Sequence, residues 1–191
     1  MDLQLRGRTA LVTGASAGIG RGIALALGAE GVHLALAARR RKLLEEVAAE
    51  VIALGGHAPV LIECDLMHDA AAERIAAAAL EGLDPVDILI NNAGGSRPFK
   101  ADAGEAQWNE ALTLNFTRAR QIAHRLLARM VERKWGRIIN ITGKSEPEGI
   151  NGAFCAKAAV HSWAKGLSRE VGKHGITVNC IAPGRILSEQ I

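Results

Sequence analysis

A strict alternation of short apolar segments with longer segments of helical periodicity constrains this chain most. The short segments are rich in Val, Ile and Leu, and continuous apolarity of that length is typical of strands buried on both faces of a parallel sheet. Six such strands are predicted, at residues 9–13, 32–37, 59–64, 86–91, 137–142 and 177–181. Helices are predicted between them, one beginning near Ile19 and the others at residues 42–54, 69–80, 105–133 and 152–173.

This alternation predicts right-handed crossovers and therefore a doubly wound α/β sheet. Asp69 is the predicted N-cap of its helix, and the helix over residues 105–133 is expected to break near Asn115. No linker or repeat divides the 191 residues, which indicates one domain spanning residues 1–191. The chain stops soon after the sixth strand, so elements that often close over a substrate are either absent or lie outside this sequence.

Composition excludes several classes of protein. With 49% hydrophobic and 23% charged residues, the chain has a globular composition. No run approaches the ~20 apolar residues that cross a bilayer, and the charged N-terminus has no apolar signal-peptide core, so we expect a cytoplasmic protein without a membrane partner. A net charge of +3 from scattered basic residues does not favour nucleic acid as a partner. Three distant cysteines (Cys64, Cys155 and Cys180) predict neither a metal site nor a disulfide framework.

The first predicted strand runs into a glycine-rich turn that opens a helix. Gly14 permits the turn, Gly18 lets the backbone approach a pyrophosphate, and Gly20 allows the helix to pack closely on the strand. The free N–H groups and the dipole at the start of the helix favour an anion. The pattern therefore predicts a dinucleotide phosphate site.

These residues resemble the short-chain dehydrogenase/reductase family, and the resemblance covers almost the whole chain. Residues 13–20 match the family's TGxxxGxG, and Asn91 to Gly94 match its NNAG after the fourth strand. Asn115 matches the asparagine of the long helix, Lys157 the active-site lysine, and Pro183-Gly184 the turn after the sixth strand. The resemblance implies a Rossmann fold that binds NAD(P). The cofactor-binding residues that it implies, together with Arg39, are Gly14, Ser16, Gly18, Ile19, Gly20, Asp65, Asn91, Ala93, Gly94, Lys157, Pro183 and Gly184.

The end of the second strand indicates which nicotinamide cofactor is preferred. An acidic residue there would bind the ribose hydroxyls of NAD, whereas an arginine would pair with the 2′-phosphate of NADP. The sequence has no acid at this point and reads Arg39, Arg40 and Arg41. We expect Arg39 to contact the phosphate, with Arg40 as a helper and Arg41 at the start of a solvated helix. NADP(H) is therefore the predicted cofactor, and NAD(H) stays open.

The chain lacks the proton donor that the resemblance implies. In the family a tyrosine four residues before the lysine protonates the substrate carbonyl, and a serine after the fifth strand holds the carbonyl oxygen. The chain contains no tyrosine; Ala153 stands four residues before Lys157, and Phe154 follows it. Ser145 or Thr142 could still bind a carbonyl oxygen, although neither aligns cleanly.

Three interpretations follow from the missing tyrosine. First, an active reductase uses Lys157 as proton donor, or a water relayed through Asn115 and Lys157, with Ser145 orienting the substrate. Second, the protein binds a dinucleotide without catalysis, as a sensor or regulatory subunit. Third, residues 143–152 are rebuilt for other chemistry, or form a solvated turn with no role.

The resemblance implies an oxidoreductase that interconverts a ketone or 3-oxo group with an alcohol, with Asn115, Lys157 and Ser145 as the catalytic candidates. The predicted partner is a small carbonyl or alcohol compound. Because the two long helices resemble those that pair between subunits in the family, a homodimer or homotetramer is expected.

Overall fold

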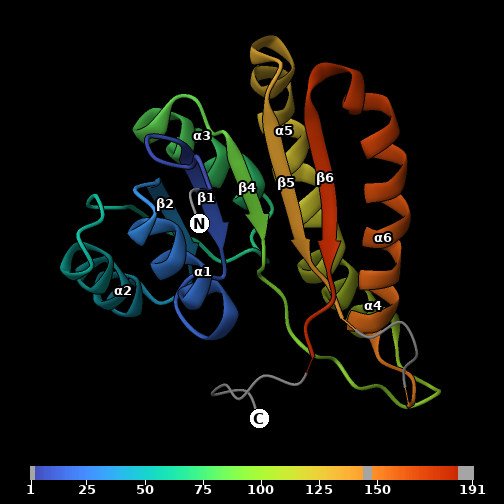
Figure 1. Ribbon diagram of the computed structural model, residues 1–191. Coiled ribbons are helices and arrows are strands. Elements are labelled where there is room, and N and C mark those ends of the chain that lie inside the picture. The colour runs from blue at the N-terminus through green and yellow to red at the C-terminus, as the bar shows by residue number, and fades with distance from the viewer. Residues whose placement is uncertain (1–2, 144–147, 185–191) are drawn as a thin grey trace.

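The computed structural model describes residues 3–143 and 148–184. Within these ranges, one parallel sheet has the strand order β3-β2-β1-β4-β5-β6 (Figure 1). The strands are β1 (Thr9–Thr13), β2 (His33–Ala38), β3 (Val60–Glu63), β4 (Ile88–Asn91), β5 (Gly136–Ile141) and β6 (Ile176–Ile181). This sheet confirms the predicted doubly wound parallel fold.

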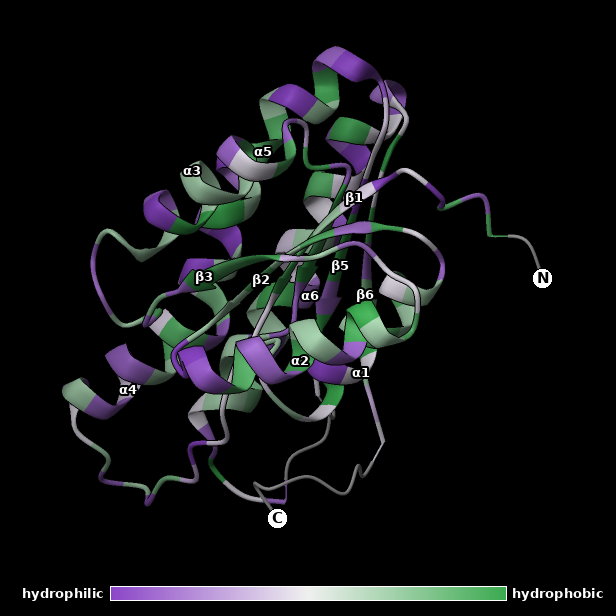
Figure 2. Ribbon diagram, turned by 90° about the vertical axis from the view of Figure 1, so that its left-hand side faces the viewer, coloured by the Kyte–Doolittle hydropathy of each residue, from purple (hydrophilic) through white to green (hydrophobic). Residues whose placement is uncertain are grey.

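Helices cover both faces of the sheet. They are α1 (Gly18–Ala29), α2 (Arg41–Ala53), α3 (Ala71–Leu83), α4 (Glu105–Leu112), α5 (Arg118–Arg133) and α6 (Gly152–Val171). One apolar core lies between the sheet and α1 and α2, and the other between the sheet and α3, α5 and α6. Figure 2 shows the apolar strands between helices that carry both apolar and polar residues. No helix in the described part of the chain is long and apolar enough to span a membrane.

The predicted strands agree with the observed ones to within about two residues. The largest shift is in β4, which begins at Ile88 rather than at residue 86. Asp87, the residue before Ile88, is held by hydrogen bonds that involve side chains. Its N–H donates to Thr9 Oγ1 at 2.9 Å, and its Oδ2 accepts the Thr9 N–H at 3.3 Å.

The long predicted helix is interrupted, as expected near Asn115, by one π-helical turn at Thr113–Thr117. The prediction that Asp69 caps α3 is wrong. That helix begins at Ala71, and a turn closed by the His68 N–H on the Asp65 carbonyl precedes it. The Asp69 side chain lies in solvent, where it pairs with the buried Arg118 at 3.4 Å.

The order of the strands places a crevice at the centre of the sheet. Strand β1 pairs with both β2 and β4, so that Ala10 lies opposite Leu34 on one side and Ile88 on the other. The chain therefore winds away from β1 in opposite directions on its two sides. In open α/β sheets, ligands bind beyond the carboxyl ends of the strands at such a switch point.

We expect Leu89→Ala to reduce the free energy of unfolding by about 2–5 kcal/mol, because Leu89 is fully buried in β4 and its truncation leaves a cavity. Leu54→Ala is the matched control: its side chain is 57% exposed, so the loss should stay within about 0.5 kcal/mol. Urea unfolding measures both values. Equal losses for the two variants would contradict this placement of the core.

Candidate functional site

A cleft of about 610 Å³ lies at the carboxyl edge of the sheet, lined by residues that follow all six strands. It contains eleven of the residues singled out from the sequence: Gly14, Ser16, Gly18, Ile19, Arg39, Asp65, Ala93, Gly94, Asn115, Lys157 and Pro183. The structure thus brings together segments from near the two ends of the chain, from Gly14 to Pro183. Gathering at this edge follows from parallel strand direction, since every carboxyl end points the same way.

The glycine turn is held against the end of β4. Gly14 and Gly18 adopt positive φ angles of 67° and 54°, which favour glycine. The Asn92 side-chain amide donates to the carbonyl oxygens of Thr13 at 3.0 Å and Gly14 at 3.1 Å. A Cβ on Gly14 would lie 2.8 Å from that amide nitrogen, so a side chain would displace it. The turn therefore leaves its backbone accessible at the first helix N-terminus.

Thr13 completes this junction from the other side. Its hydroxyl donates to the Ile90 carbonyl at 3.2 Å and accepts from the backbone N–H groups of Asn92 and Ala93 at 3.1 and 3.2 Å. Sequence reasoning missed the structural roles of Thr13 and Asn92. Each of these polar residues stands at the end of a predicted strand, which the sequence shows. Only the strand order, with β1 beside β4, shows that the two residues meet.

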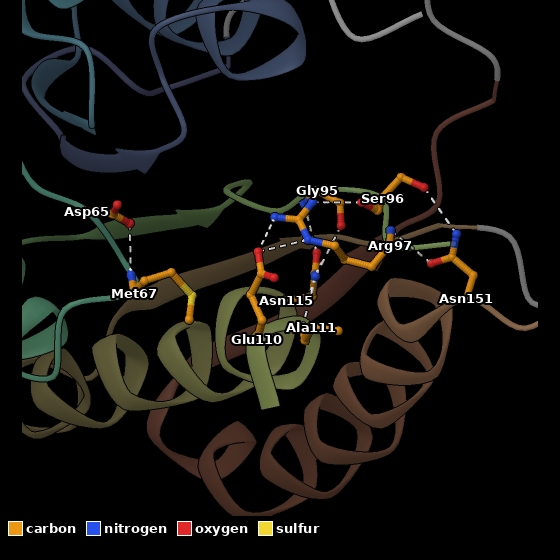
Figure 3. A network of polar contacts seen from close by, with 9 residues as sticks. All are labelled: Asp65, Met67, Gly95, Ser96, Arg97, Glu110, Ala111, Asn115 and Asn151. Carbon is orange, nitrogen blue, oxygen red and sulfur yellow. Dashed lines mark hydrogen bonds and ion pairs between the residues drawn. The ribbon is translucent and has the colours of Figure 1, made fainter. Parts of the chain in front are cut away.

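Basic residues lie where β2 ends. Arg39 and Arg40 are exposed and line the cleft. Arg41 pairs with Glu45 one helical turn later, at 3.0 Å, as expected of a residue that opens a solvated helix. Asp65 also lines this end, and its Oδ1 accepts the Met67 N–H at 2.9 Å (Figure 3). This carboxylate thus closes its own turn while one side of it faces the cleft.

Lys157 projects from α6 into the centre of the cleft. Its Nζ donates to the Ile141 carbonyl at the end of β5, at 2.7 Å. Desolvation lowers the pKa of Lys157 to about 8, although the nearby Cys180 acts weakly in the opposite direction. An ammonium group with this pKa is charged at neutral pH and can still release its proton.

Asn115 lies beside Lys157 on the π-helical turn. Its Oδ1 accepts the Gly95 N–H at 3.0 Å, and its Nδ2 donates to the carbonyls of Ala111 at 3.0 Å and Gly95 at 3.2 Å (Figure 3). A Cβ on Gly94 would lie 2.7 Å from Asn115 Oδ1 and 3.3 Å from Lys157 Nζ. The buried amide therefore fixes the backbone that passes beside the lysine.

An apolar wall of Ala153 and Phe154 stands where the resemblance implies a phenol. Ala153 and Phe154 both line the cleft, and Ala153 contributes only a methyl group. The Thr142 hydroxyl also lies here, and it donates to the Ile181 carbonyl at 3.1 Å. Ser145 is outside the described residues.

Three residues expected at the cofactor site do not line the cleft. Asn91 points to the opposite face, where its Nδ2 donates to Asn140 Oδ1 at 2.9 Å; strand alternation directs neighbouring Asn92 to the turn instead. Gly20 is buried under Gly14. Gly184 is exposed beyond Pro183. Asn91 and Gly20 therefore support the cleft from beneath, as the close packing predicted for Gly20 requires, and their part in cofactor binding stays a prediction.

A polar network that the sequence did not reveal forms the end of the cleft beyond Asn115 (Figure 3). Arg97 donates to Glu110 Oε1 from Nε at 3.0 Å and from Nη2 at 2.6 Å. Asn151, the N-cap of α6, accepts the Arg97 N–H at 3.3 Å and donates to Ser96 Oγ at 3.1 Å. This end of the cleft joins α4, α6 and the segment after β4.

The turn gives a prediction with a matched control. In Gly20→Ala the new Cβ would clash with the Gly14 carbonyl and the Asn92 amide, which should cost about 1–3 kcal/mol of stability. Gly22 lies on the same helix with nothing within 4 Å of an added Cβ, so Gly22→Ala should stabilise by up to about 1 kcal/mol. Urea unfolding measures both, and opposite signs are expected. A stabilised Gly20→Ala would contradict the close packing of the turn.

Comparisons with known proteins agree with this geometry. The family model described as short chain dehydrogenase matches residues 8–190. Nodulation protein G of Rhizobium sp. (strain N33) is 38% identical over 97% of this chain and 76% of its own length.

Two solved structures are similar as well. A 7α-hydroxysteroid dehydrogenase complexed with NADH and 7-oxoglycochenodeoxycholic acid has a TM-score of 0.90 and 32% identity, over 98% of this chain and 74% of that one. A metagenomic short-chain oxidoreductase in complex with NADP has a TM-score of 0.87 and 31% identity, over 95% of this chain and 84% of that one. With the sheet order, the glycine turn and the lysine of α6, these matches establish that the chain belongs to the short-chain dehydrogenase family.

Proposed function

We propose that this protein is an NADP(H)-dependent oxidoreductase that interconverts a ketone or 3-oxo group with an alcohol. The observation that carries the proposal is the convergence of the glycine turn, Arg39 and Lys157 on one cleft. Family membership supports a nicotinamide cofactor, and the solved relatives include one complex with NADH and one with NADP. The preference for the phosphorylated cofactor is inferred from Arg39.

The residues of the cleft fit a dinucleotide. Gly14 and Gly18 line the cleft and carry no side chain of their own to cover the backbone, which suits a pyrophosphate. Arg39 and Arg40 stand where an adenosine 2′-phosphate would lie, and Asp65 stands near the adenine position. Lys157, beside Gly94, would hold the nicotinamide ribose. Ser16, Ile19, Ala93 and Pro183 line the space between these groups.

The chemistry divides between the cofactor and the chain. A bound reduced nicotinamide supplies the hydride that reduces a carbonyl carbon. Lys157 donates the proton to the carbonyl oxygen, because its lowered pKa makes the ammonium a usable acid near neutral pH. Asn115 positions Gly95 and so shapes the backbone beside that ammonium. Ala153 and Phe154 provide an apolar wall that excludes water from the reacting atoms.

A catalytically silent dinucleotide-binding protein is the second candidate, favoured by one observation: the chain has no tyrosine, and Ala153 stands one helical turn before Lys157. Losing one acid–base group costs typically ~10²–10⁴ in rate rather than all activity. The two candidates share the cofactor site and differ in whether Lys157 transfers a proton.

The homo-oligomer, the cytoplasmic location and the single-domain organisation stay predictions. For the oligomer, sedimentation velocity on the purified chain is the direct measurement.

Removing the charge at Arg39 tests the cofactor preference. In Arg39→Gln we expect the dissociation constant of NADPH to rise about 10- to 100-fold, since a charged hydrogen bond contributes about 1.5–3 kcal/mol. The affinity for NADH should change less than about twofold. Arg41→Gln is the control, because that guanidinium pairs with Glu45 and does not line the cleft. Nucleotide fluorescence gives each constant, and equal losses for NADPH and NADH would refute the role of Arg39.

The pKa of Lys157 predicts the pH dependence of carbonyl reduction. The proton donor is charged below its pKa of about 8, so kcat should be constant at lower pH and fall about tenfold per unit at higher pH. The rate of NADPH oxidation by an activated diketone, measured with both compounds saturating at each pH, gives this kcat.

Lys157→Arg keeps a cation but not a transferable proton, since a guanidinium is not deprotonated in proteins. It should retain NADPH binding and lose about 10²–10⁴ in rate. Retained binding with no rate above background in either protein would instead support the silent protein, and equal measurable rates would contradict Lys157 as the proton donor.

A further inference from the structure

We propose that Arg97 binds a carboxylate of the substrate, so that the substrates are small oxo acids and the corresponding hydroxy acids. This inference rests on the proposed function, because it assigns the group that lies beyond the reacting carbonyl. It depends on four observations: the orientation of the guanidinium, its unused donors, its anchorage and its separation from Lys157.

The Arg97 guanidinium has a fixed orientation in the wall of the cleft. Its side chain is 34% exposed, and it lies over Gly95, where an added Cβ would come within 2.9 Å of Nη1. Glu110 accepts from Nε and Nη2, and the Ser96 carbonyl accepts from Nη1 at 2.7 Å. The charged group is therefore presented to the cleft in one orientation before any ligand binds.

Two of its donors are unused. A guanidinium has five N–H groups, and the contacts above use one on Nε, one on Nη1 and one on Nη2. No acceptor among the described residues takes the second N–H of either Nη atom. An arginine that offers N–H groups from both terminal nitrogens matches the two oxygens of a carboxylate.

Glu110 orients the guanidinium without removing the preference for an anion. Its side chain is 43% exposed, so its charge is solvated and screened. Among the described residues, Arg97, Glu110 and Lys157 together give this end of the cleft one net positive charge. An anionic substrate gains more from that charge than a neutral ketone does.

The same helix cap anchors both cations. The Arg97 backbone N–H donates to Asn151 Oδ1, and its carbonyl accepts the Gly152 N–H at 2.9 Å. Asn151 and Gly152 begin α6, the helix that carries Lys157. The position of Arg97 relative to Lys157 is therefore set by one hydrogen-bonded unit.

The two cations flank consecutive glycines. Lys157 Nζ would lie 3.3 Å from a Cβ on Gly94, and Arg97 Nη1 would lie 2.9 Å from a Cβ on Gly95. Adjacent Cα atoms are about 3.8 Å apart. Lys157 and Arg97 thus lie beside neighbouring residues of the cleft wall, and a small substrate whose carbonyl oxygen meets Lys157 would direct its carboxylate toward Arg97.

The test compares 3-oxobutanoate with its methyl ester, which carries one more methyl group and no negative charge, in the presence of saturating NADPH. Calorimetry gives the dissociation constant of each compound, and NADPH oxidation gives kcat/KM where turnover occurs. We expect the acid to be favoured at least tenfold over the ester. Arg97→Gln should reduce the affinity for the acid at least tenfold and change the affinity for the ester less than twofold.

Two further variants complete the test. Arg120→Gln removes an exposed arginine of α5 outside the cleft and should leave the preference unchanged. Arg97→Lys keeps the charge without the planar pair of N–H donors, and it should retain part of the preference for the acid over the ester. The proposal can therefore be tested even if Arg97→Gln fails to fold.

The possible outcomes distinguish a failure of the role of Arg97 from a failure of the proposed function. Absence of NADPH binding to the parent protein would overturn the proposed function itself. If NADPH binds but the acid and the ester have equal affinity, including no measurable affinity for either, the role of Arg97 is overturned. An equal loss of affinity for both compounds in Arg97→Gln would also overturn the role of Arg97.

Discussion

The junction between the ends of β1 and β4 is the contact on which the site depends. Asn92 donates hydrogen bonds to Thr13 from its backbone and its side chain, and with a further one to Gly14 they hold the glycine turn against the neighbouring strand β4. Gly20 lets α1 approach so closely that a single added methyl group would collide with the turn. The backbone that would receive a pyrophosphate is therefore shaped before ligand arrives, and its shape is set by packing beneath it.

A second junction fixes the opposite end of the cleft. Asn151 caps α6 and also holds the segment that carries Arg97, while Asn115 holds Gly95 from the π-helical turn. These contacts bring three segments far apart in sequence to one place, and all three also line the cleft. Because the Asn115 and Asn151 side chains bond to the backbone of Gly95 and Arg97, they fix the segment that carries Arg97 relative to the helix that carries Lys157.

In the proposed function, the lysine takes the acid–base role because the chain has no tyrosine. Burial makes the ammonium of Lys157 easier to deprotonate, and its charge would stabilise an oxygen that develops negative charge. Ala153, one helical turn earlier, contributes only a methyl group to the cleft. A site of this kind can transfer a proton with one cation and can orient an acidic substrate with another, which the test on Arg97 addresses.

The sequence by itself determined the order of strands and helices, the glycine turn, the basic end of β2 and the absence of tyrosine, because each is a local pattern or a count. Tertiary structure decided which of two neighbouring asparagines meets the turn, since strands buried on both faces carry no polar alternation to mark their sides. It also decided the capping of α3, the pairing of Arg97 with Glu110 and the lowered pKa of Lys157. These depend on burial and on contacts between distant segments, which no local pattern encodes.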